Sequence, residues 1–153
     1  MTDIVDRETR SRMMAGIGGR NTRPELALRS ALHARGFRFR LHARDLPGKP
    51  DIVLPRYRAV IFVHGCFWHR HADCRYATTP ATRPEFWQEK FAGNVRRDAA
   101  AVAELRHRRW RVAIVWECGL RTVADVGASA DIVAGWLRGD GVTLETGGRA
   151  TGS

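Results

Sequence analysis

The sequence predicts an α/β domain in which helices flank a central mixed β-sheet. Three observations lead to this fold class. The chain has 153 residues, a length that fits one domain with its own hydrophobic core. Short apolar, β-branched runs typical of buried strands are spaced along it. Between them lie longer segments with helical spacing of apolar residues, which predicts the order helix, three strands, helix, strand, helix.

The N-terminal segments are predicted to be an arm and a capped helix. Residues 1–20 are polar and arginine-rich, and we expect a short helix or an arm that becomes ordered on binding. In the following TRPELALRSALHARG, Thr22 and Glu25 have the spacing of a capping box, and Pro24 lies in the first turn. Gly36 then ends the predicted helix.

Three predicted strands follow this helix. FRFRL at 37–41 alternates apolar and basic residues, which indicates a strand with one solvated face. DIVL at 51–54 and AVIFV at 59–63 are apolar runs joined by the turn-like PRYR. We interpret these two runs as buried strands of one hairpin.

The second half of the chain is predicted to contain two helices and one more strand. A long helix is expected at 84–109, because its apolar residues keep a helical spacing. RVAIVWEC at 111–118 has the composition of a buried strand, and 128–137 that of a closing helix. We place a single domain at 1–138 and expect the Gly- and Thr-rich tail, 139–153, to be disordered.

The charge balance indicates an anionic partner. The formal net charge is +10, which makes nucleic acid the first candidate. Only Lys49 and Lys90 are lysine, so a genomic bias toward arginine codons is an alternative source of the charge. No apolar run is long enough to cross a bilayer, and MTDIVDRETR lacks the apolar core of a signal peptide. We therefore expect a soluble, cytoplasmic protein without a membrane partner.

The stretch GCFWHRHADC has the donors of a metal site. Cys66, His71 and Cys74 lie within nine residues, and the third cysteine, Cys118, ends the last predicted strand. A central sheet can bring that strand end beside the loop, which gives a Cys₃His set suited to tetrahedral, structural zinc. His69 is a competing histidine ligand. The alternative is that the cysteines are small core residues, because disulfides are not expected in a chain without a secretion signal.

A second candidate site lies at the ends of two predicted strands. Asp51 begins one buried strand and His64 ends the next, so a hairpin would bring both side chains to one end of the sheet. A carboxylate beside a histidine fits a Mg²⁺ site with a water-activating partner. Asp98 on the long helix is a candidate second carboxylate. The alternatives are a turn aspartate after Pro50 and a hydrogen-bonded loop histidine, with Glu25 serving only as the capping-box acid.

Aromatic residues accompany the expected zinc ligands. Phe67 and Trp68 lie between them, and Trp87 begins the long helix. Large apolar side chains on a rigid, basic surface can insert between base pairs of DNA. The alternative is burial in the core, where we place Trp110 and Trp116. On the first interpretation, zinc stiffens a loop whose aromatic residues are directed at DNA.

Four segments together resemble one known family. LPGKPDIV at 46–53, FVHGCFWHRHADC at 62–74, PATRPEFWQEKFAGNVRRD at 80–98 and WRVAIVWEC at 110–118 are similar to the very short patch repair (Vsr) DNA mismatch endonucleases, a resemblance that spans residues 7–120. It implies a restriction-endonuclease-like core with structural zinc and catalytic Mg²⁺. It also implies nicking of duplex DNA on the 5′ side of the thymine in T:G mismatches, which arise when 5-methylcytosine deaminates.

The resemblance also implies roles for individual residues. Asp51 matches the Mg²⁺ ligand, with the main-chain carbonyl of Val63 as a further ligand. His64 matches the water-activating histidine, and Asp98 matches the carboxylate that supports it. Glu25 and His69 match further polar members of the active site. The zinc ligands correspond to Cys66, His71, Cys74 and Cys118. The intercalating residues correspond to Phe67, Trp68 and Trp87.

Two departures from related sequences matter. The usual restriction-type core carries a lysine after the strand acid, whereas this strand ends in VHG, which removes that lysine's role. Two residues, Ala72 and Asp73, stand where some family members have one between the zinc histidine and the next cysteine. The choice between His71 and His69 as the zinc ligand therefore stays open.

The resemblance implies double-stranded DNA as the substrate of a monomeric nuclease associated with the bacterial nucleoid. Mismatch-repair proteins and a paired DNA cytosine methyltransferase are further expected partners. Three other functions stay open: a zinc-stabilised DNA-binding module without catalysis, a related restriction-system nuclease that ignores mismatches, and catalysis by the zinc itself. The last conflicts with four protein ligands, which leave zinc no open position.

Overall fold

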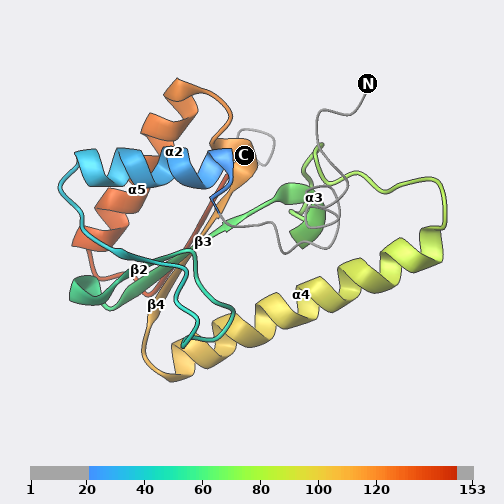
Figure 1. The fold of residues 1–153 in the computed structure, drawn as a ribbon, viewed down its shortest axis with the longest axis horizontal. Coiled ribbons are helices and arrows are strands. Elements are labelled where there is room, and N and C mark those ends of the chain that lie inside the picture. Colours follow the sequence, from blue (N-terminus) through green and yellow to red (C-terminus); the bar gives the residue numbers. More distant parts are fainter. Residues whose placement is uncertain (1–20, 148–153) are drawn as a thin grey trace.

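A five-stranded mixed sheet is the frame of the protein in a computed structural model, which describes residues 21–147 (Figure 1). The strands stand in chain order across the sheet: β1 (Arg40–Leu41), β2 (Ile52–Leu54), β3 (Ala59–His64), β4 (Arg111–Trp116) and β5 (Thr143–Thr146). The pairs β1–β2 and β2–β3 are antiparallel, while β3–β4 and β4–β5 are parallel. The predicted mixed sheet is confirmed.

Helices cover both faces of this sheet, so the architecture has three layers (Figure 1). Helices α2 (Arg23–Ala34) and α5 (Val123–Arg138) pack together on one face, and α4 (Pro84–His107) lies on the other. A single short helical turn, α3 (Cys66–His69), follows β3, and two 3₁₀ turns lie at Pro55–Tyr57 and Glu117–Gly119. None of the helices in the described part of the chain is long and apolar enough to cross a membrane.

Strand β3 divides its side chains between the two cores by simple alternation. Ala59 and Ile61 pack in the core under α2 and α5, whereas Val60 and Phe62 pack in the core under α4. Successive side chains on a strand point to opposite faces, so His64, two residues after Phe62, belongs to the α4 side. This alternation places the last residue of the strand where α4 can reach it.

Both ends of α2 follow the predicted chemistry. Thr22 Oγ1 accepts a hydrogen bond from Glu25 N at 3.3 Å, which caps the first turn. The Glu25 carboxylate accepts from Asn21 N at 3.0 Å, one residue before the position used in a capping box. At the other end, Gly36 has φ +95°, a left-handed conformation that glycine adopts without steric cost.

The strand predicted at 37–41 is shorter in the structure, where only Arg40–Leu41 pair with β2. Phe37 belongs instead to the C-terminal cap of α2. Its N–H donates to Leu32 O at 3.1 Å while Gly36 N donates to His33 O at 3.0 Å, the two bonds of a Schellman cap. The side chain of Phe37 is buried against the α2–α5 core, so this residue caps a helix rather than opening a strand.

The hairpin prediction is confirmed. Strands β2 and β3 pair with Leu54 opposite Ala59 and Ile52 opposite Ile61, and the 3₁₀ turn between them replaces a tight hairpin loop. Because this register continues outward from Ile52, the residue before β2 and the end of β3 lie at the same end of the sheet. Trp110 and Trp116 are buried, as the sequence predicts.

The structure corrects the expected disorder of the C-terminal tail for residues 143–146. They form β5, parallel to β4 at the edge of the sheet, with Val112 opposite Thr143 and Val115 opposite Thr146. Leu144 packs against the α2–α5 core, and this burial, together with backbone pairing to β4, gives a polar segment a fixed place. Residues 148–153 of the predicted tail and the predicted arm at 1–20 lie outside the described residues.

Helix α5 is also longer than expected, because it begins at Val123 rather than at residue 128. Thr122 Oγ1 accepts from Asp125 N at 3.0 Å and caps the first turn. The signal was a threonine followed three residues later by an acid, the same pattern that marks the start of α2.

Candidate active site and metal centre

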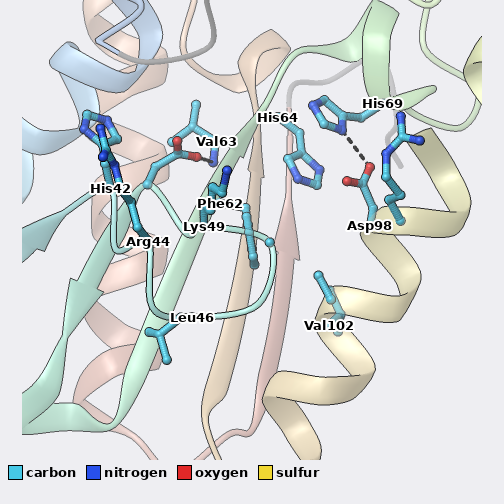
Figure 2. A pocket seen from close by; sticks show the side chains of 14 residues that line it. His42, Arg44, Leu46, Lys49, Phe62, Val63, His64, His69, Asp98 and Val102 are labelled. Atoms are coloured by element: carbon cyan, nitrogen blue, oxygen red, sulfur yellow. Dashed lines mark hydrogen bonds and ion pairs between the residues drawn. The ribbon is translucent and has the colours of Figure 1, made fainter. Parts of the chain in front are cut away.

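A pocket of about 470 Å³ lies between the end of the β2–β3 hairpin and helix α4 (Figure 2). It collects acids, histidines and cations from four separate segments of the chain. Its polar lining residues are Asp51, Asp98, His42, His64, His69, Arg44, Lys49 and Arg97. The sequence-predicted pair, Asp51 and His64, therefore lines one cavity.

Asp51 is held at the mouth of β2 by the neighbouring strand. Its Oδ2 accepts a hydrogen bond from Val63 N at 2.7 Å. The pairing of β2 with β3 runs only as far as Ile52 opposite Ile61, so Val63 N is left for the carboxylate. In an extended strand the N–H and C=O of one residue point to the same neighbour, and the Val63 carbonyl is therefore directed to the same side as the Asp51 carboxylate.

The pKa of Asp51 is raised to about 7. Burial is the largest cause, the hydrogen bond from Val63 opposes it, and the negative charge of Glu25 adds to it. Glu25 is fully buried beside the pocket. Its carboxylate is held by His42 at 2.7 Å and by Arg29 at 3.1 Å. The raised pKa of Asp51 beside a second carboxylate marks a place where a divalent cation would relieve the repulsion.

The donor set around Asp51 fits such a cation. Ligand atoms of Glu25, His42 and Asp51 all lie within 4.8 Å of one another, and the Val63 carbonyl faces the same place. Carboxylate and carbonyl oxygens are the ligands that Mg²⁺ prefers, and Mg²⁺ also keeps several waters, for which the pocket has room.

Across the pocket, two histidine rings lie face to face. His64 at the end of β3 stacks on His69 at the end of α3, with ring centroids 3.9 Å apart and planes 6° apart. His69 Nδ1 donates to Asp98 Oδ2 at 2.6 Å (Figure 2). The structure thus brings Asp98 to the histidines, but its direct hydrogen bond goes to His69 rather than to His64, the partner that the resemblance implies.

His64 is neutral at physiological pH. Its pKa is lowered to about 3. Burial is the largest cause, the neighbouring His69 adds to it, and the charge of Asp98 opposes both. His64 Nδ1 is buried and has no hydrogen-bond partner among residues 21–147. A neutral imidazole accepts a proton on the ring nitrogen that carries none, and His64 lines the pocket, so it can serve as a base toward a water there.

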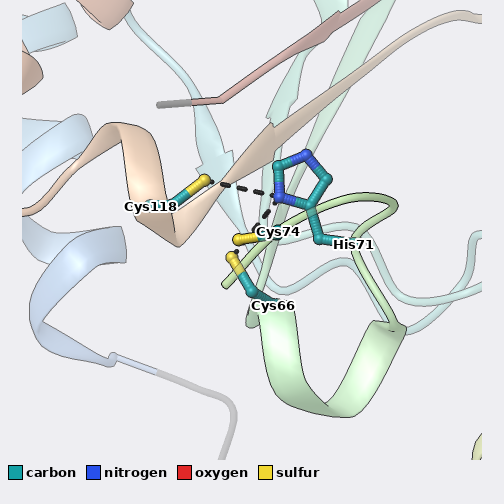
Figure 3. Close-up of side chains that lie close together, drawn as sticks. All are labelled: Cys66, His71, Cys74 and Cys118. Atoms are coloured by element: carbon teal, nitrogen blue, oxygen red, sulfur yellow. Dashed lines mark hydrogen bonds between the residues drawn. The ribbon is translucent and has the colours of Figure 1, made fainter. Parts of the chain in front are cut away.

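A second cluster of donors begins two residues after His64 and contains three buried cysteines and a histidine: Cys66, His71, Cys74 and Cys118 (Figure 3). His71 Nδ1 lies 3.6 Å from Cys66 Sγ and 3.4 Å from Cys118 Sγ, and all four ligand atoms lie within 4.8 Å of one another. Around a tetrahedral zinc ion, with Zn–S bonds of about 2.3 Å, the sulfur atoms lie about 3.8 Å apart. The cluster therefore fits zinc.

The structure places only one of the two candidate zinc histidines with the cysteines. His71 lies with the cysteines, and His69 is bound to Asp98 in the other site. Burial lowers the pKa of His71, which favours the neutral imidazole that binds metals. Burial also raises the pKa of the Cys66 thiol, so a metal ion would have to displace its proton.

Neighbouring residues bury the cluster, whose four residues are at most 8% exposed. The His71 ring stacks on Trp116 at 4.2 Å with planes 8° apart, and Trp116 Nε1 donates to Glu145 Oε2 at 2.7 Å. A Cβ placed on Gly147 would lie 2.9 Å from His71 Cε1 and 3.2 Å from Cys118 Sγ. The C-terminal strand thus covers the cluster at contact distance.

The predicted intercalating residues gather where α3 meets α4. Phe67, Trp68 and Trp87 are half-buried, with ring centroids 5.0 to 5.8 Å apart. Phe91 lies beneath them, buried, 5.1 Å from Phe67 and 5.6 Å from Trp87. Phe86 extends the cluster and is 48% exposed. We name these five residues the aromatic cluster; it lies neither in the core nor fully in solvent.

Sequence reasoning missed His42 as a member of the site. Its N–H donates to Asp51 O at 3.0 Å, and the β1–β2 register places Leu41 opposite Ile52. The signal was the strand pairing itself: the residue after FRFRL must lie opposite the residue before IVL. It also missed Arg70, which stands between the two candidate histidines and stacks on Phe91 of the aromatic cluster.

The sequence of this chain is similar to that of known DNA endonucleases. The family model described as DNA mismatch endonuclease Vsr matches residues 2–76. The chain is 50% identical over 128 residues to the type II nicking enzyme V.XorIIP of Xanthomonas oryzae pv. oryzae, covering 84% of this chain and 91% of that protein. It is 44% identical over 147 residues to the DNA mismatch endonuclease Vsr of Escherichia coli, covering 95% of this chain and 94% of that protein.

A third relative is the type II nicking enzyme V.NmeAIP of Neisseria meningitidis, 41% identical over 124 residues, covering 81% of this chain and 88% of that protein. The match to the Escherichia coli protein is long enough to span both donor clusters and the aromatic cluster.

Proposed function

The chain belongs to the Vsr family of DNA mismatch endonucleases, and from this premise we propose that it nicks duplex DNA on the 5′ side of the thymine in a T:G mismatch by Mg²⁺-dependent hydrolysis. The family makes it a DNA endonuclease with a role in DNA repair. We extend the proposal to a restriction-endonuclease-like core, because the β2–β3 hairpin with its acid at the mouth is the arrangement that the resemblance implies.

The observation that carries this proposal is the pairing of unlike groups across one pocket. On one side, Asp51, Glu25 and the Val63 carbonyl would hold Mg²⁺. On the other, His64 offers a neutral nitrogen without a protein partner. Bound Mg²⁺ would neutralise charge on the scissile phosphate and on the leaving oxygen.

The residues of this chain supply the proton transfer. A water between the two sides would give its proton to the His64 imidazole as its oxygen attacks phosphorus. The Asp98 carboxylate, bound to the stacked His69 ring, favours the positive charge that then develops on His64. As the new P–O bond forms, the bond to the leaving oxygen breaks and one strand is cut.

Selectivity for a mismatch would come from the aromatic cluster. Phe67, Trp68 and Trp87 are packed on one another yet half-exposed, so they can enter the base stack without unfolding a core. A poorly paired step costs less to unstack than a paired one, which would favour the T:G site. The zinc site would be structural and would fix the short helix that carries two of these aromatic residues.

A second candidate function rests on the names of the relatives. Two of the three relatives above are described as type II nicking enzymes, which favours a nicking enzyme of a restriction system as the alternative. Such an enzyme would cut DNA with weaker preference for the mismatch.

One nicking experiment separates these functions. Matched duplexes with T:G or C:G at one position are incubated with Mg²⁺ and the wild type, Asp51→Asn, or the control Asp45→Asn, whose exposed side chain does not line the pocket. We expect wild-type nicking of T:G to exceed that of C:G by about 10²-fold or more, and Asp51→Asn to lose about 10³-fold with DNA binding retained.

Each other outcome supports an alternative. Equal nicking of both duplexes favours the nicking enzyme without mismatch selectivity. Tight DNA binding by a wild type that never nicks in Mg²⁺ favours a non-catalytic binding module. Nicking by the zinc protein without added Mg²⁺ would place catalysis at the cysteine cluster.

A further inference from the structure

The side chain of Arg70 binds acceptors of its own chain. The residue caps α3, and its guanidinium makes four hydrogen bonds: Nη1 donates to Phe67 O at 3.2 Å and Thr78 O at 2.8 Å, and Nη2 donates to Ala77 O and Thr79 Oγ1, each at 3.0 Å. A guanidinium has five N–H donors, so four are committed. Although the chain has a net charge of +10, most donors of this arginine bind acceptors of its own chain.

The same guanidinium lies under the aromatic cluster. Its Cζ is 4.0 Å from the centroid of the Phe91 ring and 5.8 Å from that of Phe67. Phe91 in turn contacts Phe67 edge-on and lies tilted against Trp87. Arg70 therefore supports the cluster from its protein side by stacking, while its hydrogen bond to Phe67 O fixes the backbone of α3.

Arg70 also connects this support to the metal site. It stands directly before the zinc ligand His71 in the chain. Its acceptors at residues 77–79 follow the ligand Cys74, and Ala77 N donates to Cys74 O at 3.0 Å. The guanidinium thus bridges the two arms of the zinc loop and presses against the rings that the first arm carries.

We propose that Arg70 is a positioning residue that couples the zinc loop to the aromatic cluster and fixes the direction in which Phe67 and Trp68 enter the DNA. This inference rests on the proposed function, because it assigns Arg70 a part in mismatch opening. Asn94 Nδ2 donates to the next carbonyl, Trp68 O, at 3.0 Å, so side chains of two segments hold neighbouring carbonyls of the short helix.

Two substitutions separate positioning from folding. Arg70 has φ +55°, a left-handed conformation that glycine adopts more readily. Arg70→Gly therefore keeps the turn that ends α3 and deletes only the side chain. Arg70→Lys keeps the charge but loses the planar fork that makes the paired bonds. The matched control is Arg75→Gly, at an exposed arginine of the same loop that stacks on Tyr76 instead.

The direct probe is a duplex with 2-aminopurine beside a T:G mismatch, whose fluorescence rises when the base is unstacked. Without Mg²⁺, we expect the fluorescence rise on binding of Arg70→Gly to be about fivefold smaller than that on binding of the wild type. The rise with Arg70→Lys should be only a little larger than that with Arg70→Gly. With Mg²⁺, we expect kcat for T:G nicking to fall about tenfold and KM to change little, because four of the five Arg70 donors already bind acceptors of its own chain. Arg75→Gly behaves as the wild type, and all variants retain one zinc per chain.

The outcomes are distinct. A normal fluorescence rise and normal kcat in Arg70→Gly overturn the inference. So does loss of zinc from both Arg70 variants, since it would assign the residue to folding of the metal loop. If the wild type nicks T:G without any rise in fluorescence, the proposed unstacking fails and the role of Arg70 fails with it. Loss of nicking in the wild type itself contradicts the proposed function.

Discussion

His64 of the pocket and Cys66 of the cysteine cluster are separated by a single residue of chain, yet the two sites differ in free volume and in the type of donor atom. The pocket has about 470 Å³ of space, oxygen donors and an imidazole nitrogen without a protein partner in the described chain. The cluster has three thiols and an imidazole, each buried and in contact with the others. Space and oxygen donors suit a hydrated Mg²⁺ and a substrate, whereas closed sulfur donors suit zinc that only stabilises.

The first way to test this contrast is to remove a zinc ligand. We expect Cys118→Ser to lower the free energy of unfolding by about 4 kcal/mol or more, because structural zinc binding is coupled to folding. Urea denaturation with metal analysis checks this. The control is addition of a chelator to the wild type, which should reproduce the loss. A variant that keeps its stability while zinc is absent would show that the cluster does not hold the fold.

Substitution in the pocket should act strongly on rate. His64→Ala is expected to lower nicking by about 10³-fold, within the range for a lost general base. Removal of this buried ring, which stacks on His69, also leaves a cavity and lowers the melting temperature, so nicking is compared at a temperature where both proteins are folded. The companion variant His69→Ala frees Asp98 and should also slow nicking. A large fall in melting temperature with normal specific activity would reverse the assigned roles.

Metal binding in the pocket should depend on pH. The pKa of Asp51 is raised to about 7, so Mg²⁺ must displace a proton below that pH. Its affinity should fall by about tenfold per pH unit below 7 and level off above it. Calorimetry in buffers of different ionisation enthalpy measures the released proton. An affinity that is flat from pH 5 to 8 would show that Asp51 is already ionised or does not bind the metal.

The same pKa fixes the sign of a stability effect in the metal-free protein. The folded state holds the Asp51 proton up to about pH 7, whereas an unfolded aspartate loses it near its ordinary value of 3.8. The folded chain binds more protons between these values, so its stability falls as pH rises through that window. Asp51→Asn should flatten this slope in denaturation curves from pH 4 to 7, and an unchanged slope would assign it to other groups.

The smallest expected effects concern the lack of space around zinc. Gly147→Ala would bring a methyl group to 2.9 Å from His71 Cε1 and should weaken zinc binding by about tenfold, as changes around metal ligands do. A Cβ on Gly135, at an exposed position of helix α5, meets nothing within 4 Å. Gly135→Ala should therefore stabilise the protein by about 0.5–1 kcal/mol. Zinc competition and thermal denaturation compare the two, and equal zinc affinities would contradict the close packing of the C-terminal strand.

Much of the fold could be predicted because its signals are local. The Thr22 cap, the alternation of β3 between two cores and the apolar spacing of α4 each depend on residues a few positions apart. The candidate ligands Asp51 and Cys66 were also predictable, since residue type and spacing narrow the chemistry of a metal site.

Partners across the fold could not be predicted in this way. Asp98 lies within reach of two stacked histidines, and only the placement of α4 gives its hydrogen bond to His69. Strand β5 has a polar sequence whose order depends on the exposed edge of β4. His42 joins the site only because β1 pairs with β2. Each depends on contacts between segments far apart in the chain, which short patterns do not encode.

The sequence by itself determined that two donor sets flank the end of β3, one of oxygen and imidazole, one of thiol and imidazole. The tertiary structure decided which histidine belongs to which set. His69 ends α3, and the left-handed turn at Arg70 redirects the chain so that His71 faces the cysteines. Two histidines two residues apart have the same chemistry, and only the backbone path between them directs each ring to its site.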